Sequence, residues 1–354
     1  MTDFTVLRSY NLTIGHHGND NAVHQLPDGI LVGSFAGMIK QFGHLYRDFF
    51  DHYGFSDNVS ADLDMVHGSD GFFMYVPANA KPSQPVRIAN LFDGRNKMPI
   101  QSRNVVIMEA GSSAELLAGD YTLSGEECTC NDVTVVVLGE VATLDMVRMQ
   151  KVNSATRLNT ATTVWQATSS QMKTHYVSLG EGNIVNSMKV KLFGKKARHI
   201  VSGLSMTQQT GHVDNDILIE HASPDCQSNQ LFKHILSDTS TGVFTGRIVV
   251  CKDAQKTEAY QRSSNILLHP KAKMKIRPQL EIYADDVKCS HGATVGQLDA
   301  EALFYLRSRG ISEAEAKKIL LHAFAGEVIN GISCESFREN VLQNLGLQQF
   351  RVKK

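Results

Sequence analysis

The feature that most constrains the fold is a series of short β-rich runs that recurs through the middle of the chain. Major runs return roughly every 24 to 31 residues, a spacing typical of solenoid coils. The clearest are Val86–Phe92, Val105–Glu109, Val133–Leu138, Thr163–Ala167, Met188–Phe193, Asp216–His221, Ile248–Cys251 and Leu280–Ala284. Gly, Asn, Asp and Ser punctuate the runs, and no helical pattern of about 10 to 15 residues separates them, which argues against an alternating βαβ sheet. A parallel β-helix and a large β-sandwich both fit this pattern.

The patterns of apolar, turn-forming and helix-capping residues divide the chain into three expected regions. Residues 1–80 carry mixed signals, residues 81–297 carry the β-rich runs, and residues 298–354 carry helical signals. In the first region, Ser34 is predicted to cap a helix with one apolar face, which Gly54 would stop.

The last region has three helix signatures. Asp299 is a predicted N-cap for Ala300–Ser308, and Gly310 occupies the place of a glycine just beyond the helix end. Ser312-Glu-Ala-Glu315 forms a capping box for a second helix, and Glu335–Asn344 is predicted to form a third. So small a helical region cannot build a core of its own, and we expect it to pack on the β domain or on a partner.

Composition and charge exclude several classes of protein. The formal net charge is only −1, so no overall field recruits nucleic acid or an anionic membrane surface. No apolar run approaches the roughly 20 residues of a membrane span, and the N-terminal residues lack the features of a secretion signal. Six cysteines in 354 residues are too few for a disulfide framework. We therefore expect a cytoplasmic protein with reduced thiols, neither membrane-bound nor associated with nucleic acid.

Motifs for common catalytic chemistry are absent from the sequence. We find no Gly-x-x-x-x-Gly-Lys-Ser/Thr phosphate loop, no His-Glu-x-x-His or paired Cys-x-x-Cys metal motif, no Gly-x-Ser-x-Gly elbow and no Gly-x-Gly-x-x-Gly fingerprint. The chain is therefore expected not to hydrolyse ATP by itself, and an assembly scaffold would also lack these motifs, as many enzymes do.

One short pair of residues could meet a metal. Cys289 and His291 follow an apolar run, in what reads as a loop of small residues. Residues two apart lie on the same side of an extended strand, where one soft metal centre can contact both. The alternative is that Cys289 is a small core residue and His291 satisfies backbone groups at a strand end.

Other conspicuous residues are interpreted structurally. Cys128 and Cys130 are predicted to be inward-facing thiols, since cysteine is among the most buried residue types. His16-His17 and His24 lie in a Gly/Asn/Asp-rich stretch that indicates a loop. The alternating charges of Lys271–Arg277 predict a strand face turned to solvent or a protected edge.

Five stretches resemble the SufB/SufD family of the SUF iron–sulfur cluster assembly machine. They are Gly242–Val250 with its Phe-x-Gly-x-Ile pattern, Asp253–Thr257, Asn265–Leu268, Pro278–Gly296 and Leu303–Ser312.

The Pro278–Gly296 stretch favours the SufD branch of this family. It reads Asp-Asp-Val-Lys-Cys-Ser-His-Gly-Ala-Thr, whereas SufB-like chains carry a Val-Glu-His-Glu-Ala-Thr version there. The resemblance implies a right-handed parallel β-helix core and so decides against a sandwich. SufD-like proteins usually have a longer helical N-terminal region than residues 1–80 provide.

The resemblance also implies a role as a non-catalytic scaffold for cluster assembly and iron acquisition. A strand near Leu280–Val287 would pair edge to edge with a SufB-like paralogue, and the helices from Asp299 to about Ile329 would dock a SufC-like ATPase. By the family match, His291 is the candidate ligand of a transient iron–sulfur cluster at the SufB interface, with Cys289 as an accessory. Because a cluster usually takes four ligands, this chain would hold no cofactor stably by itself.

Two alternatives stay open from the sequence. The first is a structural β-helix protein that forms a homodimer in isolation and has no iron role. The second is a β-helix enzyme acting on polysaccharide, although no clustered carboxylates are evident.

Overall fold

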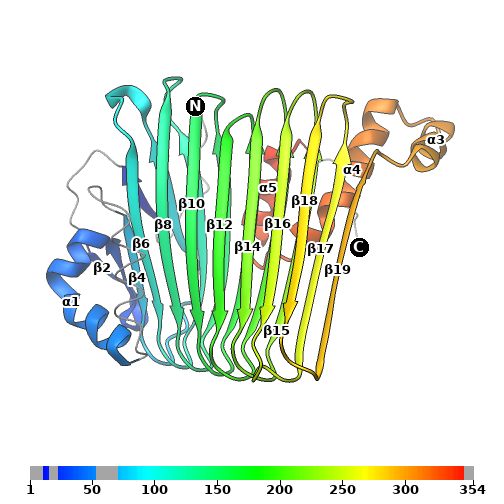
Figure 1. Ribbon diagram of the computed structural model, residues 1–354. Coiled ribbons are helices and arrows are strands. Elements are labelled where there is room, and N and C mark those ends of the chain that lie inside the picture. The colour runs from blue at the N-terminus through cyan, green and yellow to red at the C-terminus, as the bar shows by residue number, and fades with distance from the viewer. Residues whose placement is uncertain (1–10, 16–22, 53–70, 347–354) are drawn as a thin grey trace.

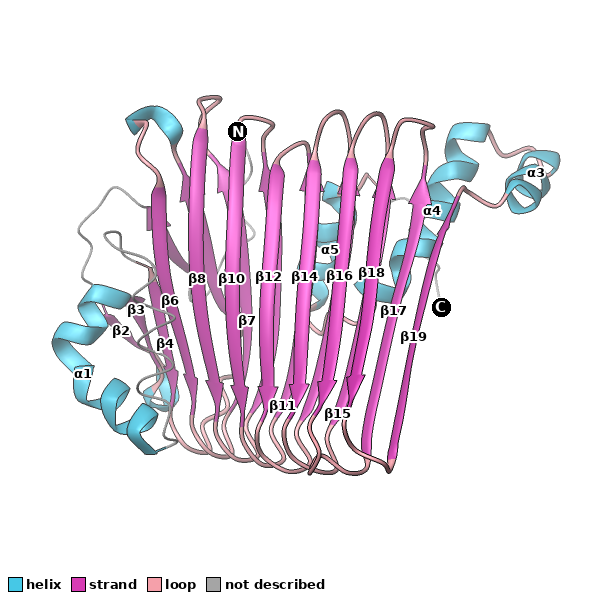
Figure 2. Cartoon of the chain, in the orientation of Figure 1, coloured by secondary structure: helices cyan, strands magenta, loops and turns pink. Residues whose placement is uncertain are grey.

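The backbone winds into a parallel β-solenoid of about eight coils, flanked by helices at both ends (Figure 1). This computed structural model describes residues 11–15, 23–52 and 71–346. Strands dominate, and long strands on opposite sides of the coil alternate along the chain (Figure 2). The predicted parallel β-helix is confirmed, and a β-sandwich is excluded by the parallel pairing of strands one coil apart.

The strands form two sheets, which we call sheet A and sheet B. Sheet A has nine strands in the order β1 (Asn11–Gly15), β5 (Val86–Phe92), β7 (Ser113–Thr122), β9 (Thr143–Val152), β11 (Gln171–Gly180), β13 (Arg198–Thr207), β15 (Gln227–Leu236), β17 (Thr257–Leu267) and β19 (Val287–Gly296). Sheet B has ten strands in the order β18 (Lys273–Ile282), β16 (Thr241–Val250), β14 (His212–His221), β12 (Asn183–Leu192), β10 (Thr156–Gln166), β8 (Cys128–Leu138), β6 (Ile100–Met108), β4 (Phe72–Val76), β3 (Leu31–Ser34) and β2 (Val23–Gln25). All pairings are parallel except those of β3 with β2 and β4.

The runs visible in the sequence belong almost entirely to sheet B. Apart from Val86–Phe92, which is β5, they overlap strands β6 to β18 of that sheet. The middle strands of sheet A, such as β9, β11 and β13, are harder to recognise because both of their faces are buried along much of their length. In β11, for example, neighbouring residues Tyr176 and Val177 are both buried on opposite faces of the strand. Such strands lose the alternation that marks a half-buried strand.

Tight turns join the two sheets within each coil. Gly111 and Gly180 have positive φ angles of 70° and 102°, as the turn-like composition around them predicts. Other coils place a non-glycine residue in the same left-handed region, including Val141 at 60° and Lys256 at 58°. The turns therefore have a common backbone shape that the sequence marks only in some coils.

The solenoid interior is close-packed and largely apolar. Phe232 and Phe244 lie with ring centroids 4.6 Å apart, and both are fully buried. Polar side chains interrupt this core and bond to one another. In the N-terminal half, Arg148 Nε donates to Asp120 Oδ2 (2.6 Å) and its Nη1 donates to Asp132 Oδ1 (2.7 Å). The charges are thus paired where they are desolvated.

Neutral polar groups form a chain through the C-terminal half of the interior. Asn186 Nδ2 donates to Asn215 Oδ1 (3.0 Å), whose own Nδ2 lies 3.2 Å from His234 Nε2. His234 Nδ1 lies 2.7 Å from Asn265 Oδ1, and Asn265 Nδ2 donates to the carbonyl oxygen of Thr294 (2.8 Å). This chain ends on the backbone of β19, the last strand.

The N-terminal helix covers the first coils of sheet B. Helix α1 (Phe35–His52) begins as predicted after Ser34, whose Oγ accepts from the backbone N–H of Gly37 (2.9 Å). Its buried residues Met38 and Phe49 join an apolar cluster with outward-facing residues of β4, β6 and β8. The predicted stop, Gly54, lies outside the described residues. Short 3-10 turns occur at η2 (Pro27–Gly29) and η3 (Gly94–Asn96).

Three C-terminal helices follow the last strand: α3 (Ala300–Ser308), α4 (Glu313–Ile329) and α5 (Glu335–Asn344). The predicted caps are confirmed, since Asp299 accepts from the first turn of α3 and Ser312 Oγ accepts from Glu315 N (3.3 Å). Gly310 follows α3 with a φ of 85°. Helices α4 and α5 pack against the outer face of sheet A, whereas α3 buries no residue.

Candidate functional site

The candidate metal-binding pair lies on the terminal strand of sheet A. Cys289 and His291 are both within β19, which pairs in parallel with β17 and has no strand on its other side among the described residues. The expectation of a small-residue loop at this position was therefore wrong. Small residues such as Gly292 and Ala293 suggested a loop, but the backbone ladder to β17 holds them extended.

Both side chains belong to the inner face of the coil. Cys289 is in register with Ala259 and packs with it in an apolar cluster that includes Ile248 and Val250. His291 is two residues further on and shares that face of the strand. Because β19 closes no further coil, His291 is exposed rather than enclosed. The structure thus places the two residues on one side of a strand, as the spacing predicts.

The environment distinguishes the two candidate ligands. Partial burial raises the pKa of the Cys289 thiol, and a backbone hydrogen bond from Ala259 only partly opposes this shift. The thiolate is the form that binds metal, so this shift makes Cys289 harder to ionise than an ordinary cysteine. His291, with its accessible ring, is the better placed ligand of the two.

Within residues 11–15, 23–52 and 71–346, no group of three or more His, Cys, Asp or Glu side chains could hold a metal ion. A cluster at His291 would therefore need ligands from another molecule.

The surroundings of this pair form an open end of the solenoid. Among residues 11–15, 23–52 and 71–346, sheet B ends at β18 and sheet A ends at β19, and most residues of both strands are at least partly exposed (Figure 1). Large apolar side chains are exposed there, including Ile282, Tyr283 (63%) and Val295 (49%). Unpaired strand edges with exposed apolar residues are templates for another chain.

The expected pairing strand, Leu280–Val287, is not a single strand. Its first residues end β18, Tyr283–Asp286 turn the chain, and Val287 begins β19. The two exposed edges are instead β18 and β19, one from each sheet. The alternating charges of residues 271–277 do lie on an edge strand, with Lys273, Lys275 and Arg277 exposed on β18.

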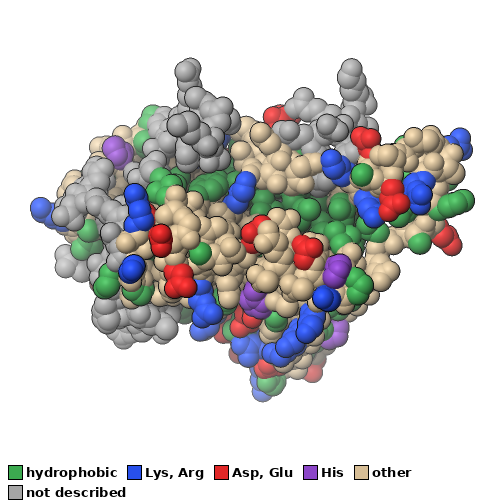
Figure 3. All heavy atoms as spheres, turned by 90° about the horizontal axis from the view of Figure 1, so that it is seen from above, with side chains coloured by type: hydrophobic (Ala, Val, Ile, Leu, Met, Phe, Trp, Pro, Cys, Tyr) green, Lys and Arg blue, Asp and Glu red, His purple; other side chains and the backbone are tan. Residues whose placement is uncertain are grey.

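A second exposed feature lies beyond the open end. Helix α3 carries Phe304 (73% exposed) and Tyr305 (57% exposed), and its neighbour α4 lies against sheet A. Seen from above, hydrophobic and charged side chains gather at the end of the molecule that carries α3 (Figure 3). This projecting helix offers an apolar surface without burying any of its own side chains.

An ion pair network fixes α4 to the last coils. Glu327 pairs with Lys233 on β15 (Nζ–Oε2, 2.6 Å) and with Arg262 on β17. Lys233 Nζ also donates to the carbonyl oxygen of Phe324 (2.9 Å). Burial and the neighbouring Arg262 charge lower the pKa of Lys233. The helix that follows α3 is thus held against the two strands that precede β19 in sheet A.

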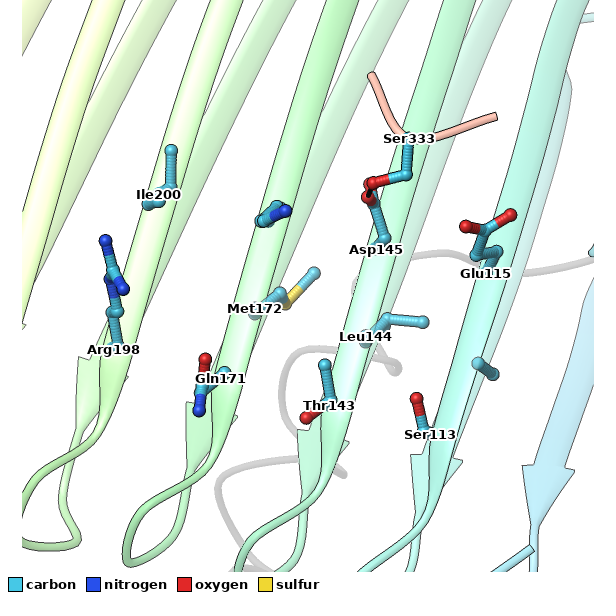
Figure 4. A pocket seen from close by; sticks show the side chains of 12 residues that line it. Ser113, Glu115, Thr143, Leu144, Asp145, Gln171, Met172, Arg198, Ile200 and Ser333 are labelled. Atoms are coloured by element: carbon cyan, nitrogen blue, oxygen red, sulfur yellow. Dashed lines mark hydrogen bonds between the residues drawn. The ribbon is translucent and has the colours of Figure 1, made fainter. Parts of the chain in front are cut away.

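The structure also contains a pocket, lined by both polar and apolar side chains, that the sequence did not predict. It has a volume of about 500 Å³ on the outer face of sheet A, lined from β7, β9, β11 and β13 and by Ser333 of the α4–α5 turn. Ser333 Oγ donates to Asp145, and Glu115 lies on the side of the pocket away from Arg198 (Figure 4). Its lining residues come from four successive coils, so no local motif marks it. The pocket lies at the seam between sheet A and the C-terminal helices.

The other residues singled out in the sequence have structural roles or lie outside the residues that the structure describes. Cys128 and Cys130 are buried inside the solenoid with their sulfurs 3.4 Å apart, which confirms inward-facing thiols. Burial raises the pKa of both thiols. His24 lies in β2 rather than in a loop. His16 and His17 lie outside the described residues.

No helix in the described parts of the chain combines the length and apolar character that crossing a membrane requires.

Comparison with protein families gives two matches that together cover most of the chain. Residues 91–324 match the family described as SUF system FeS cluster assembly, SufBD core domain. Residues 12–88 match the SufBD protein N-terminal region. The core match spans the solenoid coils, β19 and most of α4.

Curated relatives agree with these matches. The iron–sulfur cluster assembly protein SufD of Escherichia coli is 39% identical over 172 residues, covering 49% of this chain but only 41% of the relative. The iron–sulfur cluster assembly SufBD family protein slr0076 of Synechocystis is 28% identical over 334 residues, covering 90% of this chain and 73% of the relative. The chloroplastic protein ABCI7 of Arabidopsis thaliana is 29% identical over 341 residues, covering 93% of this chain and 69% of the relative. The segment matched in the E. coli protein is thus less than half of that protein.

Proposed function

The chain belongs to the SufBD family of the SUF iron–sulfur cluster assembly system, and we propose that it is a non-catalytic scaffold subunit of that system. In this role it pairs with a SufB-like paralogue, binds a SufC-like ATPase and contributes to cluster assembly and iron acquisition. The observation that carries the proposal is the open end of the solenoid, where an exposed histidine lies on the edge strand β19. The match to E. coli SufD and the Cys-Ser-His sequence of β19 both favour the SufD branch.

Edge pairing with a paralogue would complete the open end. A partner strand beside β18 or β19 would satisfy exposed backbone groups and cover Ile282, Tyr283 and Val295. Two copies of this chain could use the same edges, so a homodimer in isolation is the competing assembly.

The metal role that we propose rests on His291, with Cys289 as an accessory ligand. An imidazole is a borderline ligand that suits iron, and two side chains leave the remaining positions of a cluster to the partner. Cys289 is partly buried and His291 is exposed, which favours His291 as the first contact. The cluster is a transient cargo of the interface and not a resident cofactor of this chain.

The ATPase contact that we propose lies on α3 and α4. Phe304 and Tyr305 present exposed aromatic rings, and aromatic residues are frequent anchors of protein interfaces. The link from α4 through Glu327 to β15 and β17 gives a bound partner a mechanical connection to the last coils. Since this sequence has no phosphate loop, ATP hydrolysis would be supplied by the partner.

The location that we propose is the cytoplasm. All six cysteines are free thiols and none forms a disulfide, which fits a reducing compartment.

Co-expression followed by native mass spectrometry tests the assembly. We expect one copy of this chain with one SufB-like chain and bound SufC-like ATPase from the same source. Recovery of only monomer or homodimer would contradict the scaffold role and favour a structural β-helix without an iron role.

The variant His291→Ala tests the metal role in that complex. It should form the complex normally but assemble less iron–sulfur cluster, as measured by the visible absorption of the reconstituted complex. His24→Ala is the matched control, because it removes an exposed histidine at the opposite end of the solenoid. Equal cluster yields for the two variants would reject His291 as a ligand.

A further inference from the structure

The Phe-x-Gly-x-Ile motif of β16 has a specific structural requirement that the proposed function does not explain. A Cβ atom at Gly246 would lie 1.8 Å from Nε2 of Gln261 and 2.7 Å from its Cδ. Any side chain at this position would therefore displace the amide of Gln261. Because Gly246 has no side chain, the amide of Gln261 fits inside the last complete coil.

Gln261 is a buried amide with only half of its hydrogen bonding satisfied. Its side chain extends from the inner face of β17, and the residue is 3% exposed. Its Nε2 donates to Gln230 Oε1 (2.9 Å) on β15. Its Oε1 is buried and has no hydrogen-bond partner among the described residues. A buried acceptor without a donor is unfavourable, which indicates that a donor from nearby completes this site.

The β17–β19 register brings His291 beside this acceptor. Gln261 and His291 are directly paired in the parallel ladder, where neighbouring strands lie about 4.8 Å apart. Paired residues in such a ladder point to the same face, and the packing of Cys289 against Ala259 places the inner residues of β19 on that face. The ring of His291 carries an N–H donor, and a change of rotamer at an exposed histidine is inexpensive.

We propose that Gln261 is a positioning residue for His291. Its Oε1 accepts the N–H of one ring nitrogen, which fixes the ring orientation and the tautomer. The lone pair of the other nitrogen then faces outward, toward the partner and its cluster. This is the arrangement by which a hydrogen-bonded neighbour orients a metal-binding histidine. The contact can be tested in the isolated chain, but its use in cluster assembly rests on the proposed role of His291.

Nitrogen-15 NMR of the histidine rings in the full chain tests the contact directly. The long-range ¹H–¹⁵N spectrum reports which ring nitrogen carries the proton, and His291→Ala identifies the His291 signals by their loss. In Gln261→Met, we expect the His291 pattern to change from one dominant tautomer to a mixture. Gln261→Glu keeps an acceptor at this position, so the ring nitrogen that faces it should remain protonated.

Gln230→Met is the matched control for loss of packing or stability. It removes the same Gln261–Gln230 hydrogen bond from an equally buried position, but one coil farther from His291. Its His291 signals should match those of the unaltered chain. Gly246→Ala should reproduce the effect of Gln261→Met, because the added methyl group displaces the amide. Unchanged His291 signals in Gln261→Met, or equal changes in Gln230→Met, would overturn the proposal.

Cluster assembly in the co-expressed complex separates this inference from the proposed function. Loss of a residue that orients a metal ligand typically weakens metal binding by about 10-fold or more, so Gln261→Met should lower cluster yield while Gln230→Met should not. Full cluster yield in His291→Ala would overturn the metal role itself, and with it the use of Gln261 in assembly. Reduced yield in His291→Ala with full yield in Gln261→Met would overturn only the positioning role.

Discussion

The two ends of the solenoid have the same coil architecture but differ in whether other elements of the chain cover the terminal coil. At the N-terminal end, β1 extends sheet A, the antiparallel strands β2 and β3 extend sheet B, and α1 covers the outer face. At the C-terminal end, no further strand among the described residues extends β18 or β19, and apolar side chains are exposed there. Repeat proteins normally protect their terminal coils, because open strand edges recruit other chains. The contrast supports the proposal that the C-terminal end takes part in assembly, whereas the N-terminal end is covered by the chain itself.

The interior differs between the same two halves. Near the N-terminal end, the buried polar groups are charged and centre on Arg148 with two aspartates. Toward the C-terminal end, they are neutral amides and histidines, ending at the backbone of β19. The charged cluster joins residues of both sheets, whereas the polar chain inside the C-terminal half consists of neutral amides and histidines.

The largest expected effect is loss of the charged cluster. Arg148→Met leaves Asp120 and Asp132 buried without their cation, and breaking a buried pair in this way costs about 3 to 5 kcal/mol. Urea unfolding should show this loss. Arg262→Met, which breaks a half-exposed pair near the open end, should cost no more than about 1 kcal/mol. Similar losses of unfolding free energy in the two variants would contradict a special role of the charged cluster in the stability of the N-terminal half.

Acid should weaken the C-terminal half before the N-terminal half. Burial lowers the pKa of His199 to about 3 and those of His221 and His234 to about 4, against a usual value near 6.5. Between pH 6.5 and about 4 the unfolded chain therefore binds more protons than the folded chain. Stability from these groups is present above pH 6.5 and falls as the pH drops, by up to about 1.4 kcal/mol per pH unit for each histidine.

The N-terminal cluster should resist the same change. Burial by itself would raise the pKa of Asp132, but the charge and hydrogen bonds of Arg148 outweigh it and the pKa is lowered. We would measure hydrogen exchange by mass spectrometry at pH 7.5 and pH 5 and correct it for intrinsic exchange rates. Between these pH values, β13–β15 should lose more protection than β7–β9. Uniform loss along the solenoid would reject this order.

A charge on the open edge should stop assembly without unfolding the chain. Val295→Lys places an ammonium on β19 where the residue is 49% exposed, so the unfolding midpoint should move little. Native mass spectrometry should show loss of the paralogue complex. The matched control is Val141→Lys, at an exposed turn distant from β19, and it should assemble normally. Normal assembly of Val295→Lys would show that β19 is not part of the interface.

The smallest expected effect concerns the surface pair at the same edge. Lys288→Met removes the ion pair between Lys288 Nζ and Glu258 Oε1 (3.1 Å), which is open to solvent. Exposed pairs of this kind contribute little to stability, so urea unfolding should be unchanged. A clear loss of unfolding free energy would mean that the stability of the open end depends on surface ion pairs.

Local signals in the sequence predicted much of this architecture. The period of the β-rich runs and the family signatures indicated the solenoid, and Ser34, Asp299 and Ser312 marked the helix starts correctly. The Cys-x-His spacing placed Cys289 and His291 on one side of a strand, although it was assigned to a loop. These features depend on residues close together in the chain, whose spacing directly determines which groups meet.

Only the tertiary structure revealed the relations between coils. Central strands of sheet A such as β11 and β13 are buried on both faces, so they lack the alternation by which sheet B was recognised. The charged cluster of Arg148 and the link from Gly246 through Gln261 to His291 join residues on different coils. Such contacts depend on the register of strands roughly 30 residues apart, which no local spacing specifies. The sequence by itself determined the repeating coil and the chemistry available on it, whereas stacking of the coils decided which side chains meet and which edge stays open.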